Sequence, residues 1–236
     1  WFYTPDMLGD KFYDASVLVL GGTALMPELH DHLNKILLRG LEEYCFNVVT
    51  TVFDFRNEKE TPGHPWPIGE SEDTYRYIDL LVVDWVEAMK MTGSSNINGA
   101  AYYFKAHGVS SFIITNGRFN LYAWSSGRSM QPLELSSLPV CQAIDDDLQA
   151  HPEWKGDDIG CGDNFCGGVI AGICQQIMSN PEELPDLLDA LAWGAAAGGC
   201  ALFLEGPVGL EQNPGAVRKQ VEPYYQSYLK QIGRKR

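Results

Sequence analysis

The sequence predicts an α/β fold in which helices cover a mostly parallel sheet. Short β-branched and apolar runs alternate along the chain with longer segments whose apolar residues recur at helical spacing. One run, Ile78–Val83, is almost continuously apolar, which is typical of a strand buried on both faces of a parallel sheet. The chain has 236 residues, 45% of them hydrophobic, so we expect residues 1–236 to form a single domain with a sizeable core.

Three predicted strands and one helix lie between Ser16 and Val83. Ser16–Leu20 is a run of β-branched residues and leucines that ends in a glycine pair, as a strand followed by a tight turn would. In Pro27–Tyr44 the leucines and isoleucine recur every three or four residues, which indicates one long amphipathic helix. Phe46–Phe53 is the second predicted strand, and Ile78–Val83 is the third.

Two helices and a hairpin are predicted next. Trp85–Met91 and Ile97–His107 have helical periodicity. Ser111–Thr115 is another apolar strand, and the Asn116–Gly117 turn then predicts a hairpin return at Asn120–Trp124.

The rest of the chain is predicted to contain a loop and two helices. Pro132–Gly156 is polar, bounded by proline and rich in acids, so we expect a loop there. Helices follow at about Asp163–Met178 and, after an Asn-Pro break, at about Leu184–Gly199. These two helices are expected to complete the fold.

Composition excludes several classes of protein. The net charge of −14 leaves no clustered basic surface outside the short tail Gly233–Arg236, so we expect no nucleic-acid partner. No segment has the order of a signal peptide, and the most apolar stretch, Leu191–Leu204, is too short to span a membrane, so we expect a cytoplasmic protein with no membrane partner. The six cysteines lack zinc-ligand spacing and are predicted to be free thiols.

Residues 157–168 carry the strongest functional signal. Gly160, Cys161 and Gly162 stand at the expected start of a helix, where unpaired N–H groups and the positive end of the helix dipole can hold a phosphate. Asp163 would then stand beside the transferred group and accept a proton from an attacking hydroxyl. The alternative is a glycine-rich helix start used for packing, with Asp163 as an ordinary first-turn acid.

This stretch resembles the Gly-Ala-Gly-Asp signature of the ribokinase-like (PfkB) carbohydrate kinases. Cys161 replaces the usual alanine, and the positions that match are Asp157, Gly160, Gly162, Asp163, Phe165, Gly167 and Gly168. The resemblance implies a ribokinase-like three-layer α/β/α fold with a mostly parallel central sheet. It also implies ATP-dependent phosphorylation of a hydroxyl of a sugar or sugar-like substrate, with Asp163 as the general base.

A second motif follows the third predicted strand. Asp84-Trp85-Val86-Glu87 resembles the family's Asn-x-x-Glu motif, with Asp84 in place of Asn. The resemblance implies that Glu87 contacts the water shell of a magnesium ion and that Asp84 borders the nucleotide. A helix N-cap Asp with a first-turn Glu explains the same two acids without a metal.

Two further segments resemble parts of the family's pattern. Thr115, Asn116 and Gly117 resemble its Thr-x-Gly-x-x-Gly loop, which borders the nucleotide, although taken alone they form an ordinary turn. Asp54 and Arg56 stand near the place of its Asp-Pro-Asn-x-x-Arg motif, but we expect Arg56 to pair with one of the chain's many acids. The five histidines are expected on the surface or in packing roles.

From about Ser16 to Gly206 the order of elements follows the C-terminal two-thirds of a ribokinase-like kinase. We expect the family's N-terminal sugar-contacting part and its lid to be missing from this chain. Two functions therefore stay open: a carbohydrate kinase, or a non-catalytic kinase-like subunit that binds nucleotide or serves as a scaffold. A dinucleotide-dependent oxidoreductase is a weaker third hypothesis.

The resemblance also implies the cofactors and partners. The cofactors are ATP and Mg²⁺, and a monovalent cation such as K⁺ is suggested only by Asp157. The partners are ATP and a sugar or sugar-like small molecule, with a second copy of the chain as a candidate homodimer partner.

Overall fold

The computed structural model describes residues 3–234, so the last two residues of the basic tail lie outside the described part. The chain divides into two compact units. The first consists of the residues up to Gly117 together with Leu121–Ser136, and the second of Arg118–Asn120 together with the residues from Ser137 onward. Each unit is described by itself, and the expectation of a single domain stays a prediction.

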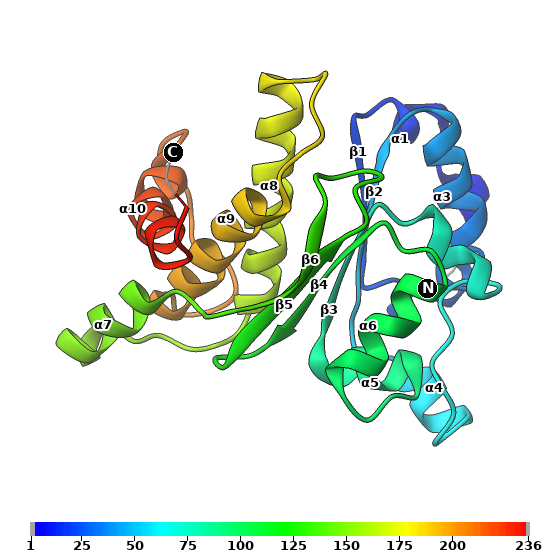
Figure 1. Cartoon of the computed structure of the whole chain (residues 1–236), viewed down its shortest axis with the longest axis horizontal. Helices are drawn as coiled ribbons and strands as arrows, with labels where there is room; N and C mark the ends of the chain where they lie inside the picture. Colours follow the sequence, from blue (N-terminus) through cyan, green and yellow to red (C-terminus); the bar gives the residue numbers. More distant parts are fainter. Residues whose placement is uncertain (1–2, 235–236) are drawn as a thin grey trace. The chain divides into compact units, whose positions relative to one another are not determined.

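A six-stranded sheet in the order β1-β2-β3-β4-β5-β6 lies mostly in the first unit, and only Asn120 of β5 and residues 137–138 of β6 are assigned to the second (Figure 1). The first four strands each run parallel to their neighbours: β1 (Val17–Gly21), β2 (Phe46–Thr50), β3 (Leu80–Asp84) and β4 (Ser111–Asn116). The links to β5 (Asn120–Ser125) and β6 (Leu133–Leu138) are too short for crossovers, so these strands run antiparallel. The predicted mostly parallel sheet and its hairpin are confirmed.

Helices make each parallel crossover in the first unit. The elements outside the sheet are the 3₁₀ turns Pro5–Met7, Thr23–Leu25 and Glu72–Tyr77 and the helices α1 (Asp10–Tyr13), α2 (Pro27–His30), α3 (Leu33–Glu42), α4 (Phe55–Glu60), α5 (Trp85–Thr92) and α6 (Ile97–Ala106). Ile36 and Leu37 of α3 and Phe104 of α6 are fully buried in the same apolar core as Leu81 and Ile114 of the sheet. The core therefore forms from the apolar faces that the sequence pattern predicts.

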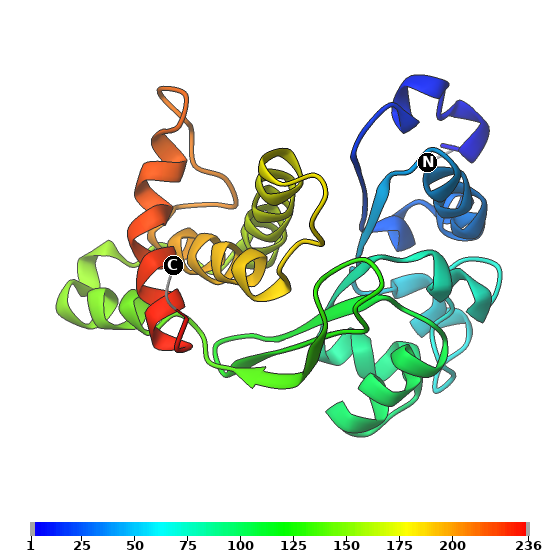
Figure 2. The same ribbon diagram turned by 45° about the horizontal axis from the view of Figure 1, so that its top comes forward.

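In the described part of the second unit, up to residue 234, the α-helices are α7 (Gln142–Ala150), α8 (Cys161–Ser179), α9 (Leu187–Cys200) and α10 (Ala216–Gln231). Two 3₁₀ turns, Pro152–Trp154 and Ala201–Phe203, join them. Helix α9 lies between α8 and α10 (Figure 2). Helices α8 and α9 approach closely at Gly168, which has no side chain to separate them. A Cβ at this position would lie 2.5 Å from the carbonyl oxygen of Trp193. On the other side, Trp193 stacks on Tyr225 of α10 with ring centroids 4.1 Å apart.

Three expectations about secondary structure are wrong. The predicted loop Pro132–Gly156 contains β6 and α7, because the alternation of apolar residues in Leu133–Leu138 was hidden by neighbouring polar residues. Helix α10 follows the two helices expected to complete the fold, and Pro223 in its middle weakened its helical signal. The long helix Pro27–Tyr44 is divided into α2 and α3, and the side chains of residues 30 and 31 at the break make tertiary contacts.

All six cysteines are free thiols, as predicted. Within residues 3–234, no helix combines the length and the apolar character needed to cross a membrane.

Candidate functional site

The residues of the glycine signature lie at the start of α8, in the second unit. Gly160 is the N-cap residue and has a φ of 80°, in the left-handed region, and it offers no side chain to cap the helix. The amide of Cys161 makes a long bond of 3.4 Å to the carbonyl of Asp158, and within residues 3–234 the amides of Gly162 and Asp163 have no acceptor. The start of α8 therefore presents open donors at the positive end of its dipole, an arrangement that binds anions.

The glycines of this region serve two different purposes. A Cβ at Gly160 would lie 2.7 Å from the backbone of Pro207, and one at Gly168 would meet α9, so packing explains both. A Cβ at Gly162 or at Gly167 would have no atom within 4 Å. Packing does not explain these two glycines, and the open space at Gly162 leaves the backbone accessible to a ligand.

Asp157 fixes the loop that leads into α8. Its amide donates to the carbonyl of Leu204 at 3.0 Å, and its carboxylate accepts the amides of Ile159 at 2.9 Å and of Gly206 at 3.0 Å. Both carboxylate oxygens therefore bond to backbone amides within the second unit. These bonds join the signature to the segment that follows the Ala201–Phe203 turn.

Asn164 makes a second link between the same segments. Its side-chain Nδ2 donates to the carbonyl of Gly160 at 2.9 Å and to that of Pro207 at 2.9 Å, and its amide donates to Gly160 at 2.8 Å. Sequence reasoning missed this residue. The available signal was its position directly after Asp163 in the motif.

Asp163 is the third residue of α8, and its side chain is exposed. Within residues 3–234 its carboxylate makes no hydrogen bond or ion pair. A carboxylate in this state can accept a proton from a bound hydroxyl. The structural alternative, an acid favoured by the helix dipole, is compatible with the same position.

Asp84 and Glu87 lie at the start of α5, in the first unit, and form a capping box. The carboxylate of Asp84 accepts the amide of Val86 at 2.7 Å, and Oε2 of Glu87 accepts the amide of Asp84 at 3.4 Å. Thr51, directly after β2, also donates its hydroxyl to Oε2 of Glu87. Burial raises the pKa of Glu87, while these two hydrogen bonds oppose the shift. The capping alternative proposed for these acids is therefore present in the structure.

The remaining oxygen of Glu87 decides whether magnesium fits. Within residues 3–234, Oε1 has no hydrogen-bond partner, and no group of three or more His, Cys, Asp or Glu side chains could hold a metal ion. Mg²⁺ usually binds proteins through one or two carboxylates and substrate phosphates and keeps several waters. The carboxylate oxygen present fits a magnesium ion held in that way, and the side chains around it do not form an all-protein cage.

Thr115, Asn116 and Gly117 lie at the carboxyl end of β4, beside the end of β3. Thr115 pairs in register with Asp84. Gly117 has a φ of 53°, and a Cβ added to it would have no atom within 4 Å. The carboxyl ends of parallel strands are where open α/β sheets bind ligands. The structure thus brings Asp84, Glu87 and this turn to the carboxyl ends of neighbouring parallel strands in the first unit. Gly160–Asp163 belong to the second unit.

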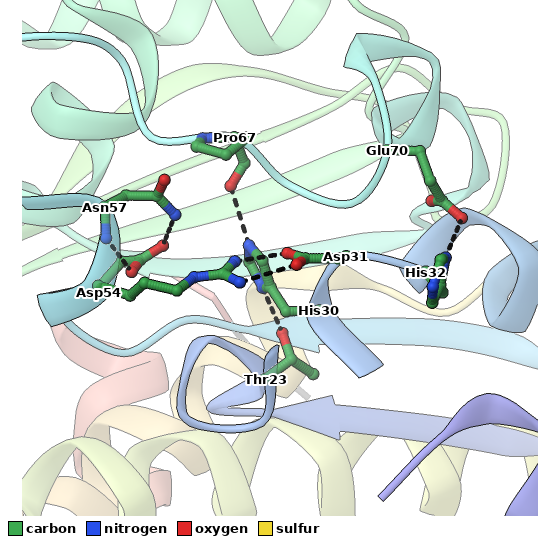
Figure 3. A network of polar contacts seen from close by, with 9 residues as sticks. Thr23, His30, Asp31, His32, Asp54, Asn57, Pro67 and Glu70 are labelled. Carbon is green, nitrogen blue, oxygen red and sulfur yellow. Dashed lines mark hydrogen bonds and ion pairs between the residues drawn. The ribbon is translucent and has the colours of Figure 1, made fainter. Parts of the chain in front are cut away.

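Figure 3 shows a polar network in the first unit that bears on the expectations for Arg56 and for one of the histidines. Arg56 forms a forked ion pair with Asp31, with one of its bonds at 2.7 Å, as expected of a residue that pairs with an acid. The same pairing lowers the pKa of Asp31. His30 is buried between the hydroxyl of Thr23 and the carbonyl of Pro67, each at 3.0 Å, which is a packing role.

Comparison with known proteins gives structural matches only: no family model and no curated protein sequence matches the chain. A fructokinase with bound ATP from Xylella fastidiosa superposes with a TM-score of 0.63 at 14% identity, covering 95% of this chain and 66% of that chain. An adenosine kinase from Schistosoma mansoni in complex with adenosine and AMP superposes with a TM-score of 0.63 at 16% identity, covering 89% of this chain and 58% of that chain. A structure described as a Ribokinase II from E. coli with ATP and Mg²⁺ superposes with a TM-score of 0.61 at 16% identity, covering 94% of this chain and 60% of that chain.

These matches confirm the ribokinase-like α/β fold that the sequence predicts. At identities of 14–16% they show the fold alone. The chain spans less than two thirds of the length of each of these structures.

Proposed function

We propose that this chain supports ATP-dependent phosphoryl transfer to a hydroxyl of a sugar or sugar-like substrate. The observation that carries the proposal is the open start of α8, where unpaired amides of Gly162 and Asp163 stand beside an exposed carboxylate. The fold supports it, because the structures that share this fold include an adenosine kinase and a fructokinase with bound ATP. Whether the chain is active by itself is part of the proposal.

In this mechanism the chain contributes position and charge. Phosphoryl transfer needs little covalent help from a protein and depends on electrostatic stabilisation of the moving phosphoryl group. The amides of Gly162 and Asp163, with the weakly bonded amide of Cys161, would stabilise charge on the γ-phosphoryl oxygens. Asp163 would accept the proton of the attacking hydroxyl. Gly160 and Asn164 would hold the turn in the conformation that exposes these amides.

Residues of the first unit would serve the nucleotide and its metal. Magnesium, when bound with ATP, neutralises charge on the phosphates. Glu87 would hold a water of the ion through Oε1 while Thr51 and the amide of Asp84 keep Oε2 in place. Asp84, Thr115, Asn116 and Gly117 would border the nucleotide. No potassium-dependent step is proposed, since both carboxylate oxygens of Asp157 already accept backbone amides.

The test is ADP release with ATP, Mg²⁺ and a panel of sugars and nucleosides. We expect turnover with at least one acceptor, and we expect Asp163→Asn to lower kcat about 10² to 10⁴-fold, the usual contribution of a general base. Asp158→Asn, an exposed acid in the same loop, is the matched control and should retain activity. An unchanged rate for Asp163→Asn would remove this residue from the mechanism.

A thermal-shift measurement separates the alternatives. A ligand that binds only the folded state raises the unfolding midpoint. If ATP raises the midpoint and no acceptor supports ADP release, the non-catalytic nucleotide-binding alternative is favoured. A shift with NAD that exceeds the shift with ATP would instead favour the oxidoreductase hypothesis.

A further inference from the structure

The two end strands of the sheet, β1 and β6, differ in how their outer sides are protected (Figure 1). Within residues 3–234 each of them pairs with one neighbouring strand only. An end strand presents backbone N–H and C=O groups that can pair with another chain, and proteins usually prevent this with charged side chains, proline or a bulge. We infer that β1 is an interface at which a second copy of this chain adds its own β1.

Alternate residues of β1 direct their backbone groups to opposite sides of the strand. Toward β2, the carbonyl of Ser16 accepts an amide at 2.9 Å, and the amide of Gly22 donates to a carbonyl at 3.0 Å. Since this direction alternates along a strand, the even-numbered residues face β2. The amides and carbonyls of Val17, Val19 and Gly21 therefore point away from β2, and no other part of residues 3–234 bonds to them.

No feature of β1 protects its outer side. Val17–Gly21 contains no charged residue and no proline, and its five residues pair with β2 in unbroken register, without a bulge. The side chain of Val19, in the middle of the strand, is 40% exposed. Residues 15–27 are all uncharged, in a chain in which 20% of the residues are charged. An open, apolar and uncharged edge of this kind is a template for pairing with another strand.

β6, at the other end of the sheet, has the protection that β1 lacks. Glu134 is exposed on this strand, and Pro132 and Pro139 flank its two ends. A charge and neighbouring prolines are among the features that keep an edge strand unpaired. The contrast favours β1 as the edge at which the sheet can be extended.

Antiparallel pairing about a two-fold axis at Val19 fits the residues of this edge. Val19 of one copy then lies opposite Val19 of the other, and Gly21 lies opposite Val17. Each of these is a hydrogen-bonded pair, so about six N–H···O bonds form between the copies. No like charges meet across the two strands, although each chain has a net charge of −14. Both copies use the same edge, so the assembly closes at two.

Sedimentation equilibrium at protein concentrations from about 1 to 200 µM measures the association. Because the interface is one pair of short strands, we expect a weak dimer with a dissociation constant on the order of 10 µM. Val19→Lys places two like charges opposite each other at the two-fold axis and should weaken the dimer by about tenfold or more. Leu38→Lys is the matched control, since Leu38 on α3 is 41% exposed in the same unit, and it should dimerise like wild type.

A proline variant separates the outer side of β1 from the side that pairs with β2. Val19→Pro removes an N–H that points away from β2, so every bond to β2 remains, as at other edge strands that contain proline. The variant should stay folded by circular dichroism and be a monomer at concentrations where wild type is a dimer. Val19→Lys tests the same contact without a backbone change.

Hydrogen exchange locates the contact within the strand. In the monomer the amides of Val17, Val19 and Gly21 have no acceptor and should exchange quickly. Those of Leu18 and Leu20 bond to β2 and should be protected in either state. Raising the protein concentration to about 200 µM should slow exchange of the first three amides by about fivefold and leave the other two unchanged.

Four results would overturn the inference. They are a monomer throughout the concentration range, a dimer that survives both Val19→Lys and Val19→Pro, association that continues beyond two copies, and a dimer in which the three outward amides exchange as fast as in the monomer. None of these measurements involves ATP or turnover, so the inference and the proposed function can fail or succeed independently.

Discussion

Two helix starts in this molecule have an acid at the same position and opposite surroundings. Helix α5 begins after Asp84 and has Glu87 as its third residue, and α8 begins after Gly160 and has Asp163 as its third residue. At α5 the two acids bond to backbone amides of the first turn, and Thr51 holds the second acid as well. At α8 the cap has no side chain, and Asp163 is exposed.

The difference shows that one helix start is stabilised by its own side chains, whereas the other keeps backbone amides available to a ligand. A capping box satisfies two of the orphan amides at a helix start, so the start of α5 is stabilised by its own side chains. Among residues 3–234 the amides of Gly162 and Asp163 at the start of α8 have no acceptor, so an anion can stabilise this helix start. The same acid spacing therefore supports the fold at one helix and leaves a carboxylate and amides free for chemistry at the other. Variants at the two helix starts test this distinction.

Two glycines of α8 should respond in opposite ways to alanine. Gly160→Ala places a side chain at a φ of 80° and 2.7 Å from the backbone of Pro207, and we expect a loss of about 1–3 kcal/mol in the free energy of unfolding. Gly162→Ala meets open space and adds a better helix former, so stability should rise by about 0.5 kcal/mol. Its methyl group would hinder a phosphate, and the KM for ATP should rise about tenfold. Urea unfolding and steady-state kinetics measure both effects.

A Gly162→Ala variant that is more stable and binds ATP normally would contradict the idea of an open anion site. A stable Gly160→Ala variant would show that the turn can relax away from Pro207.

Replacing Asn164 should lower both stability and kcat, although the residue lies at the start of a helix with exposed neighbours. Asn164→Ala removes the two bonds to the carbonyls of Gly160 and Pro207, and we expect a loss of about 1–2 kcal/mol with a lower kcat. Asn164→Asp places a carboxylate against the same carbonyls and should lose more. Asn180→Ala, at the other end of α8, is the matched control and should change kcat little. Equal effects of Asn164→Ala and Asn180→Ala would leave Asn164 without a positioning role.

The sequence predicted the parallel strands and the starts of both helices because their signals are local. Ile78–Val83 is almost continuously apolar, and Asp84 and Glu87 have the spacing of a capping box. It could not predict contacts that join distant segments. Thr51 reaches Glu87, and Asn164 reaches Pro207, only after the chain has folded. The break between α2 and α3 has the same origin, since Arg56 and Pro67 contact residues 30 and 31 from far along the chain.

Removing the cap of α5 should have a moderate effect on stability. Asp84→Ala loses the bond to the amide of Val86, and we expect a loss of about 1 kcal/mol in the free energy of unfolding. Asn96→Ala is the matched control, because Asn96 caps α6 in the same unit by accepting the amide of Gly99 at 3.0 Å. If Asp84 borders the nucleotide, its variant alone should also raise the KM for ATP. Identical kinetics for the two variants would confine Asp84 to capping.

The smallest effect expected is a pH dependence at Glu87. Burial raises the pKa of this carboxyl above its ordinary value of 4.5, because the charged form loses solvation. The stability contributed by the protonated form is therefore fully present below pH 4.5 and is lost as the pH rises through the folded-state pKa. Glu87→Gln keeps an oxygen that can accept from Thr51 and from the amide of Asp84 but does not titrate.

Unfolding measured against pH should show wild type losing stability relative to Glu87→Gln as the pH rises through this window. The difference should be on the order of 0.5 kcal/mol, because partial exposure screens the charge. Glu134→Gln, at an exposed position of β6, is the control and should follow wild type. If wild type instead loses stability relative to Glu87→Gln as the pH falls, the ionised form of Glu87 is the one stabilised in the fold. The carboxylate would then be held by its bonds to Thr51 and Asp84 more strongly than burial opposes it, and α5 would be capped by a charge instead of a neutral acid.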